Sequence, residues 1–326
     1  MAAEIAISPS ARGHLRRLDM RRDLVKVADL VELCFYDTLD AEGKKYLNEM
    51  RKAAQVASFM GIASNLISDT TMPPSGYVWE EDGRLVGNLS LIPIVVQRKR
   101  AYMIANVATH PDYRHQGIAR QLTLAALKHA RINGAPSVWL QVRDDNPTAI
   151  HIYLSNGFIE RLRRTNWYNG PTYPELPVPA GIEVGKRQVN HWMLQQRWLK
   201  RIYPDELNWH MPFNWNLFRP DILGKLYRAL NLEFLHHWSV ERDGELKGVA
   251  SWRHARGFTD SLWLAIPEQV DEEATLALIL KMRKDIHQGQ PLSLNLPHNL
   301  AVEVLKRASF YPHQTLIWME YPLSQR

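Results

Sequence analysis

The stretch from Ile104 to Arg131, IANVATHPDYRHQGIARQLTLAALKHAR, combines residue types that suit the binding of a phosphate. An apolar run ends at Thr109, a turn-forming His110-Pro111-Asp112 follows, and an amphipathic pattern of helical period begins at Gly117. The first amides of a helix have no partner within it and lie at the positive end of its dipole, so they can hold an anion. Gly117 has no Cβ to obstruct a phosphate, and Ala119 has the next smallest side chain. The sequence therefore predicts a phosphate site between a strand and a helix.

The residues of this stretch also resemble a known family. Arg114-x-x-Gly117-x-Ala119 is similar to the Q/R-x-x-G-x-G/A motif of the GNAT superfamily of N-acetyltransferases. A second segment, Asn146-Pro147-Thr148-Ala149 … Tyr153 … Gly157-Phe158, resembles N-x-x-A-x-x-x-Y-x-x-x-G-F, which follows the next strand in these enzymes. The two segments occur in the family's order and at its spacing. The resemblance covers the first half of the chain in fold and motifs, and the second half in architecture only.

The resemblance implies that acetyl-CoA is the cosubstrate and that acetyl passes directly to a primary amine. It places Val107, Ala108 and Thr109 along the pantetheine arm. It assigns the pyrophosphate to the turn and the helix start, which are His115, Gln116, Gly117, Ile118, Ala119 and Arg120. It also places Asn146 in the cofactor site. Tyr153 matches the family's general acid for the CoA thiolate, since a phenol of pKa about 10 is protonated at neutral pH.

The general base that would deprotonate the amine is not evident. The strand position at which relatives often carry Glu or His holds Met103, Ala105 and Asn106 here. Carboxylates in the expected turns are usually solvated, so a water relay is an equal alternative; they are Glu80, Glu81, Asp144 and Asp145. The acceptor is left open as a small-molecule or peptide amine. The rival interpretation is a non-catalytic acetyl-CoA-binding or sensing module.

The composition bounds these interpretations. The chain has 326 residues, enough for two domains, with a net charge of +6 and no basic run long enough for a nucleic-acid surface. The Arg161–Arg164 cluster is expected to be a solvated face, and the single Cys34 a buried small hydrophobe on a helix. No secretion signal, membrane span or metal-ligand spacing is present, so we expect a cytoplasmic protein without metal, membrane or nucleic-acid partners. Its oligomeric state is not predicted.

Prolines mark an expected domain junction. The segment from Gly170 to Gly185, GPTYPELPVPAGIEVG, contains four prolines. We expect a GNAT acetyltransferase domain at 1–172, a linker at 173–183 and a degenerate GNAT-like domain at 184–326. The fold class is mixed α/β, with two tandem domains. In the first domain the patterns predict strands at 14–18, 101–109 and 137–142 and a hairpin around Asp82; they predict helices at 23–36, in parts of 41–71, at 117–131 and at 147–156.

The two halves look like copies of one another. Asp82-Gly83 and Asp243-Gly244 each lie between strand-like runs, at an offset of 243 − 82 = 161. The segment ending at Phe158 resembles the one ending at Phe310, at an offset of 310 − 158 = 152.

This similarity predicts that the second copy has lost the cofactor site. Aligning Pro111 with Pro267 puts Glu273 at the position of Gly117 and Thr275 at that of Ala119, while the 152 offset puts Leu305 at that of Tyr153. Carboxylates at a helix start satisfy its dipole and repel phosphate. The aromatic run of the second half is expected to be core between the domains or the wall of a pocket: Trp192, Trp198, Trp209, Phe213, Trp215 and Phe218.

Overall fold

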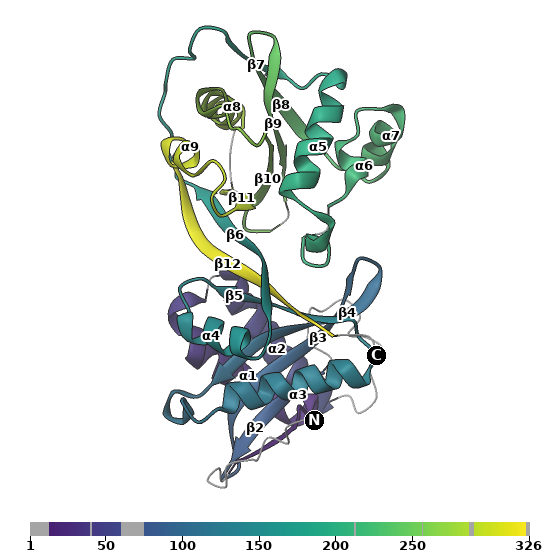
Figure 1. Cartoon of the computed structure of the whole chain (residues 1–326), viewed down its shortest axis with the longest axis vertical. Helices are drawn as coiled ribbons and strands as arrows, with labels where there is room; N and C mark the ends of the chain where they lie inside the picture. The colour runs from purple at the N-terminus through teal and green to yellow at the C-terminus, as the bar shows by residue number, and fades with distance from the viewer. Residues whose placement is uncertain are drawn as a thin grey trace. The chain divides into compact units, whose positions relative to one another are not determined.

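A computed structural model describes residues 13–39, 41–59, 75–211, 213–255, 257–286 and 290–323. The chain forms two compact units (Figure 1). The first unit comprises residues 1–142, 146–161 and 318–326, and the second comprises 143–145 and 162–317. Neither unit is continuous in the sequence, so the expected limits at 172 and 184 stay a prediction. Residues 171–179 contain no helix or strand.

The first unit is a mixed sheet with helices on both faces. Its strands follow one another in the order β1 (Gly13–Arg17), β2 (Ser75–Glu81), β3 (Arg84–Val96), β4 (Lys99–Thr109) and β5 (Ser137–Arg143). The first four are antiparallel, and β5 joins β4 in parallel. Its helices are α1 (Met20–Phe35), α2 (Ala41–Phe59), α3 (Ile118–Ile132) and α4 (Pro147–Ser155).

The alternation of side chains along β2 separates the helices onto opposite faces. The Tyr77 hydroxyl lies 3.1 Å from His129 Nδ1 on α3, whereas Val78 packs into the core formed with α1 and α2. Figure 1 shows α3 on one face of the sheet and α1 and α2 on the other.

The predicted elements of the first half are confirmed to within three residues. The first helix starts earlier than predicted because Asp19 caps it, accepting a hydrogen bond from the Arg21 amide at 2.9 Å. Of the segment predicted to be helical in parts, 41–59 is helical, and the rest lies outside the described residues.

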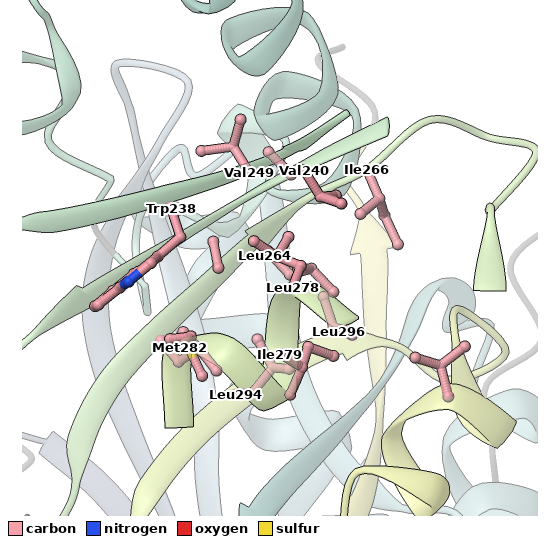
Figure 2. Packing of buried hydrophobic residues seen from close by; sticks show 14 of the residues in the cluster. Trp238, Val240, Val249, Leu264, Ile266, Leu278, Ile279, Met282, Leu294 and Leu296 are labelled. Carbon is pink, nitrogen blue, oxygen red and sulfur yellow. The ribbon is translucent and has the colours of Figure 1, made fainter. Parts of the chain in front are cut away.

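The second unit repeats this plan. Its strands β7 (Ile182–Lys186), β8 (His236–Arg242), β9 (Glu245–Arg253), β10 (Asp260–Ala265) and β11 (Leu292–Pro297) are joined at the β11 side by β6 (Ile159–Asn169). The helices are α5 (Trp192–Ile202), α6 (Trp215–Phe218), α7 (Ile222–Leu230), α8 (Glu272–Asp285) and α9 (Val302–Arg307). Figure 2 shows Leu278, Ile279 and Met282 of α8 packed against apolar side chains of the strands.

Most of the aromatic run belongs to the core of the second unit. Trp198 and Phe218 are buried, and Trp192, Phe213 and Trp215 pack against them. The stacked rings of Phe213 and Phe218 have centroids 4.5 Å apart. Trp192 and Trp215 also line a surface groove, as expected for the wall of a pocket.

The internal repeat extends to backbone details. The hairpin residues Asp82 and Asp243 have φ of 48° and 52°, and the glycine after each is also left-handed. The ladder shifts register directly after Trp79 in β2 and after Val240 in β8, again 240 − 79 = 161 residues apart. A β-bulge that recurs at one offset is a feature of a shared fold, not of a chance sequence match.

The two units exchange strands. β6 lies within the expected first domain, 1–172, but pairs antiparallel with β11 inside the second unit, from Tyr168 opposite Ser293 to Arg164 opposite Pro297. The last strand, β12 (Phe310–Pro322), begins in the second unit and ends in the first, where Trp318 is 1% exposed. Each unit therefore includes part of a strand that the sequence analysis assigns to the other domain.

Arg164 shows one consequence of this exchange. The prediction that the Arg161–Arg164 cluster is a solvated face is wrong for this residue, which is 1% exposed. Its guanidinium donates to the carbonyls of Ile202 at 2.7 Å and Asn295 at 2.9 Å and lies over the Tyr203 ring. Burial lowers the pKa of Arg164 to about 10.

Candidate active site

The first unit opens where β4 and β5 part. The two parallel strands pair at only three positions, the last being Ile104 opposite Leu140. Beyond that point β4 continues to Thr109 and β5 to Arg143, but these two strands do not pair with each other. Backbone groups of β4 that face such a gap are free to bind an extended ligand.

Buried polar atoms near this opening lack partners in the described part of the chain. They are Asn88 Oδ1 on β3, Thr109 Oγ1 at the end of β4 and Gln141 Nε2 on β5, one residue past the last pair. A buried polar atom without a hydrogen bond costs free energy, so each of these atoms is a position at which a ligand or water can bind.

The turn after β4 presents the start of α3. Residues Pro111–Tyr113 form one turn of 3₁₀ helix, and His115 and Gly117 then adopt left-handed backbone with φ of 63° and 78°. The first intrahelical bond runs from the Gln121 amide to the Gly117 carbonyl, and no side chain caps the helix. The amides of Ile118, Ala119 and Arg120 are therefore without an acceptor inside the helix.

The predicted phosphate-binding residues lie together at this helix start. His115, Gln116, Gly117 and Arg120 are exposed, and a Cβ built on Gly117 would meet nothing within 4 Å. Open space next to unpaired amides at the positive end of a helix is the geometry that an anion requires. Ile118 and Ala119 differ from the others: Ile118 is buried and Ala119 half-buried, so their backbone rather than their side chains is available.

The three predicted pantetheine residues form the end of β4. Ala108 is 2% exposed and packs into the core with α1, while Val107 and Thr109 are half-buried. Asn146 lies farther on, where its Oδ1 caps α4 by accepting from the Ala149 amide at 3.1 Å. The structure thus gives Asn146 a capping role beside the cofactor role predicted for it.

Tyr153 is held rigidly on α4. It is 7% exposed, and its ring meets Phe158 edge-on at 5.8 Å between centroids. Burial raises the pKa of its phenol above the ordinary value, because the charged phenolate would lose its hydration. The group is therefore fully protonated at neutral pH, as a proton donor must be.

A polar cluster inside the first unit was not predicted. Asn106 has φ of 51° and forms a bulge on β4, where the register shifts between Asn88 and Ser90. Its Nδ2 donates to the Tyr46 hydroxyl at 3.2 Å, and its carbonyl accepts from Asn88 Nδ2 at 2.9 Å. In the sequence, the one indication of this cluster is that Asn106 occupies the strand position where relatives often carry a base. Only the fold brings Tyr46 and Asn88 to it.

Two of the four candidate bases are engaged in ion pairs. Glu80 forms ion pairs with Arg16 and Arg22, both at 2.7 Å, and the hydrogen bond from Arg16 lowers its pKa. Asp145 pairs with Arg143, which lowers its pKa in the same way. Carboxylates held in ion pairs make poor proton acceptors at neutral pH.

Cys34 lies closer to the site than expected. It is half-buried rather than buried, and its thiol at the end of α1 donates to the Thr109 carbonyl at 3.3 Å. Burial raises the pKa of this thiol. Arg114 Nε also donates to the Thr109 carbonyl, at 3.4 Å, so three elements meet at the end of β4.

The equivalent position of the second unit is closed to an anion. Asp271 caps α8 by accepting from the Ala274 amide at 3.0 Å, and its carboxylate pairs with Arg242 at 2.9 Å. Glu272 and Glu273 complete an acidic first turn. The helix dipole is thus satisfied by the chain itself.

The helix caps correct the alignment of the two copies. The N-cap Asp271 corresponds to Gly117, at 271 − 117 = 154, so the prediction of Glu273 at that position is wrong by two residues. The loop is shorter in the second unit. The N-cap Asp271 comes six residues after the end of β10 at Ala265, whereas Gly117 comes eight residues after the end of β4 at Thr109. An acidic residue still occupies the position.

The correspondence of Leu305 with Tyr153 is confirmed, because the C-caps Asn156 and Ala308 of the two helices are also 308 − 156 = 152 residues apart.

No described helix is long and apolar enough to cross a membrane. Within the same ranges, no three His, Cys, Asp or Glu side chains gather in a way that could hold a metal ion.

Comparisons with known proteins match the part of the chain that holds this site. Residues 36–158 match the model of the acetyltransferase (GNAT) family. The [ribosomal protein bS18]-alanine N-acetyltransferase of Escherichia coli K12 is 40% identical over 63 residues, which are 19% of this chain and 43% of the relative. The mycothiol acetyltransferase of Nocardiopsis dassonvillei is 44% identical over 52 residues, 16% of each chain. The matches thus span less than half the length of these curated relatives.

A solved structure extends the likeness in fold to both units. The GCN5-related N-acetyltransferase of Sphaerobacter thermophilus superposes with a TM-score of 0.53 at 11% identity, covering 95% of this chain and 96% of that one. At this identity the likeness concerns the fold alone. The parted strands and the uncapped helix start lie within residues 36–158, the part of the chain that matches the acetyltransferase (GNAT) family model.

Proposed function

We propose that the first unit binds acetyl-CoA and transfers its acetyl group to a primary amine. One observation carries the proposal: α3 starts without a cap, behind two left-handed residues and next to open space at Gly117. At the corresponding helix start of the second unit, Asp271 caps the helix. A helix start left open in one copy and capped in the other is best explained by a ligand that caps it.

The parted strands support the same ligand. The pyrophosphate of acetyl-CoA would lie on the amides of residues 115–120, and the pantetheine arm would run along Val107–Thr109, whose edge is free of β5. The unpartnered Thr109 Oγ1 and Gln141 Nε2 are suited to hydrogen bonds with an arm that carries two amides.

Tyr153 is the proposed general acid. Attack by a neutral amine on the thioester forms the amide C–N bond and breaks the C–S bond, and the CoA thiolate takes a proton from the phenol. The proton that the amine nitrogen loses passes to water, from which the phenolate is reprotonated. Because burial raises the pKa of the phenol above its ordinary value, the phenol stays protonated in the pH range in which an ordinary amine loses its proton. We propose no side chain as base, since Glu80 and Asp145 are in ion pairs.

The acceptor is proposed only as a class, a primary amine of a peptide or of a small molecule. Two curated relatives are named for an alanine of a ribosomal protein and for mycothiol. These names support an amine acceptor and do not choose between the two sizes.

Two measurements on the full chain test the proposal. Calorimetry should show acetyl-CoA binding that CoA competes for and free adenosine does not. Release of CoA thiol should then be followed with a panel of amines, including peptides with different N-terminal residues and small diamines. Binding without thiol release above the hydrolysis rate for any amine would favour the non-catalytic sensing module, and the absence of binding would reject both interpretations.

A further inference from the structure

Helix α7 of the second unit carries its apolar side chains on the outside. Ile222, Leu223, Leu226 and Leu230 are 80%, 63%, 54% and 75% exposed. At 3.6 residues per turn these four positions lie within about 100° around the helix axis, the width of the stripe that a surface helix normally turns toward a core. Here the stripe faces away from the protein.

The opposite face of α7 is firmly attached, so the orientation of the stripe is fixed. Arg228 donates from one nitrogen to the carbonyls of Leu217 at 2.7 Å and Arg219 at 2.9 Å. The Tyr227 hydroxyl accepts from Asn214 Nδ2 at 2.7 Å. Gly224 packs so closely that a Cβ would meet the Arg219 carbonyl. Turning the apolar face inward would break all of these contacts.

The residues after the helix enlarge the apolar surface. Leu232 is 81% exposed and Phe234 is 73% exposed. At roughly 200 Å² for a fully exposed residue of this size, these two and the four on α7 expose on the order of 800 Å² together. A standard interface buries about 800 Å² on each partner, so the exposed apolar area on α7 and the residues after it is of the size that an interface needs.

The stripe is complementary to itself. If two copies of α7 lie antiparallel with a two-fold axis at Leu226, Ile222 faces Leu230 of the second copy and Leu223 faces Ala229 of the second copy. Lys225 then stays at the edge, in solvent, where it is exposed now. A two-fold interface requires one patch that fits its own copy, and this spacing meets that condition.

We infer that the α7 face is the interface of a homodimer, with Leu226 on its two-fold axis. A membrane surface is a poorer occupant, because interfacial helices carry many basic residues on their polar side. The helix α7 has two, Lys225 and Arg228, and Arg228 is occupied with backbone carbonyls. This inference does not depend on the acetyl-transfer chemistry of the first unit.

Sedimentation equilibrium of the full chain from 0.5 to about 50 μM tests the inference. The wild type should be dimeric in this range. Leu226→Glu removes a buried contact and sets two carboxylates against each other on the axis, so the dissociation constant should rise at least about 100-fold. Lys225→Glu, on the same helix but off the stripe, should change it by less than about threefold.

Crosslinking provides a second test that does not require a charge. A cysteine at a two-fold axis meets its own copy, so Leu226→Cys should form a disulfide-linked dimer under mild oxidation. Leu154→Cys on α4, with 52% exposure, is the matched control, and the wild type reports any reaction of Cys34. If circular dichroism shows that Leu226→Glu does not fold, the cysteine variant decides.

Three results would overturn the inference. They are a wild type that stays monomeric throughout the concentration range, a dimer that Leu226→Glu leaves intact, and a monomer that sediments with anionic lipid vesicles through Leu226.

Discussion

Replacing Gly117 by glutamate tests the anion site most directly. Gly117 has φ of 78°, and a Cβ there would enter open space at the uncapped start of α3. The same helix offers a matched control. Gly134, which follows its other end, has φ of 69° and also has nothing within 4 Å of its Cβ position. Glutamate at either position carries the same left-handed strain, about 1–2 kcal/mol, but only Gly117→Glu places a carboxylate where phosphate is proposed to bind.

The expected loss of affinity follows from the charges. A carboxylate about 5 Å from one phosphate charge costs roughly 1–3 kcal/mol at an effective dielectric constant between about 20 and 80. The pyrophosphate carries about two charges within reach, partly screened by solvent. A total of about 2–3 kcal/mol corresponds to a 30- to 150-fold rise in the dissociation constant for acetyl-CoA. The backbone strain is present with and without ligand, so it lowers the stability of both variants and largely cancels from the binding free energy.

Calorimetry with acetyl-CoA measures both variants, and urea unfolding confirms that they lose similar stability. Gly134→Glu should bind within about twofold of the wild type. The reasoning would be refuted if Gly117→Glu bound acetyl-CoA normally, or if both glutamates weakened binding equally, since the effect would then come from strain and not from charge at the helix start.

Four further predictions concern the acid, its pH dependence, the number of sites and the exchanged strand. Tyr153→Phe keeps the buried ring and removes the proton, so kcat should fall about 10²- to 10⁴-fold with acetyl-CoA affinity nearly unchanged; a variant with wild-type kcat would make Tyr153 purely structural. Because burial raises the Tyr153 pKa, kcat should rise as the acceptor amine deprotonates and should show no fall near pH 10, the ordinary phenol pKa, in a profile taken with stable buffers. Since Asp271 caps α8, calorimetry should give one acetyl-CoA per chain; a stoichiometry of two would contradict this. Arg164→Ala leaves buried carbonyls unpaired and should lower the free energy of unfolding by about 3 kcal/mol in urea, whereas Arg161→Ala, which breaks a half-exposed ion pair with Glu320, should cost less than about 1 kcal/mol.

Local pattern was enough to predict most elements of the first unit. The spacing of apolar residues and the Asp-Gly turns are set by neighbours in the sequence, and the strands and helices formed within three residues of the predicted bounds. The loop at Gly117 was predictable for the same reason. A helix start needs only local residues, and the order of Gly117 and Tyr153 in the two motifs indicated the family.

Contacts between distant residues were beyond that reach. The bulge at Asn106 depends on Asn88 and Tyr46, which the fold brings from β3 and α2. The burial of Arg164 depends on β11, 131 residues away at Asn295. A pattern of arginines looks solvated when the strand that covers it is not known.

By itself, the sequence determined the repeated α/β plan, the helix start built for an anion and the acidic replacement of that start in the second copy. Each of these depends on residue types within about one turn or one hairpin. Only the tertiary structure decided that β6 pairs within the second unit, that β12 ends in the first unit and that α7 turns its apolar stripe outward. Hydrophobic periodicity indicates that a strand or helix has an apolar face. Which surface covers that face is decided by packing among all the elements at once.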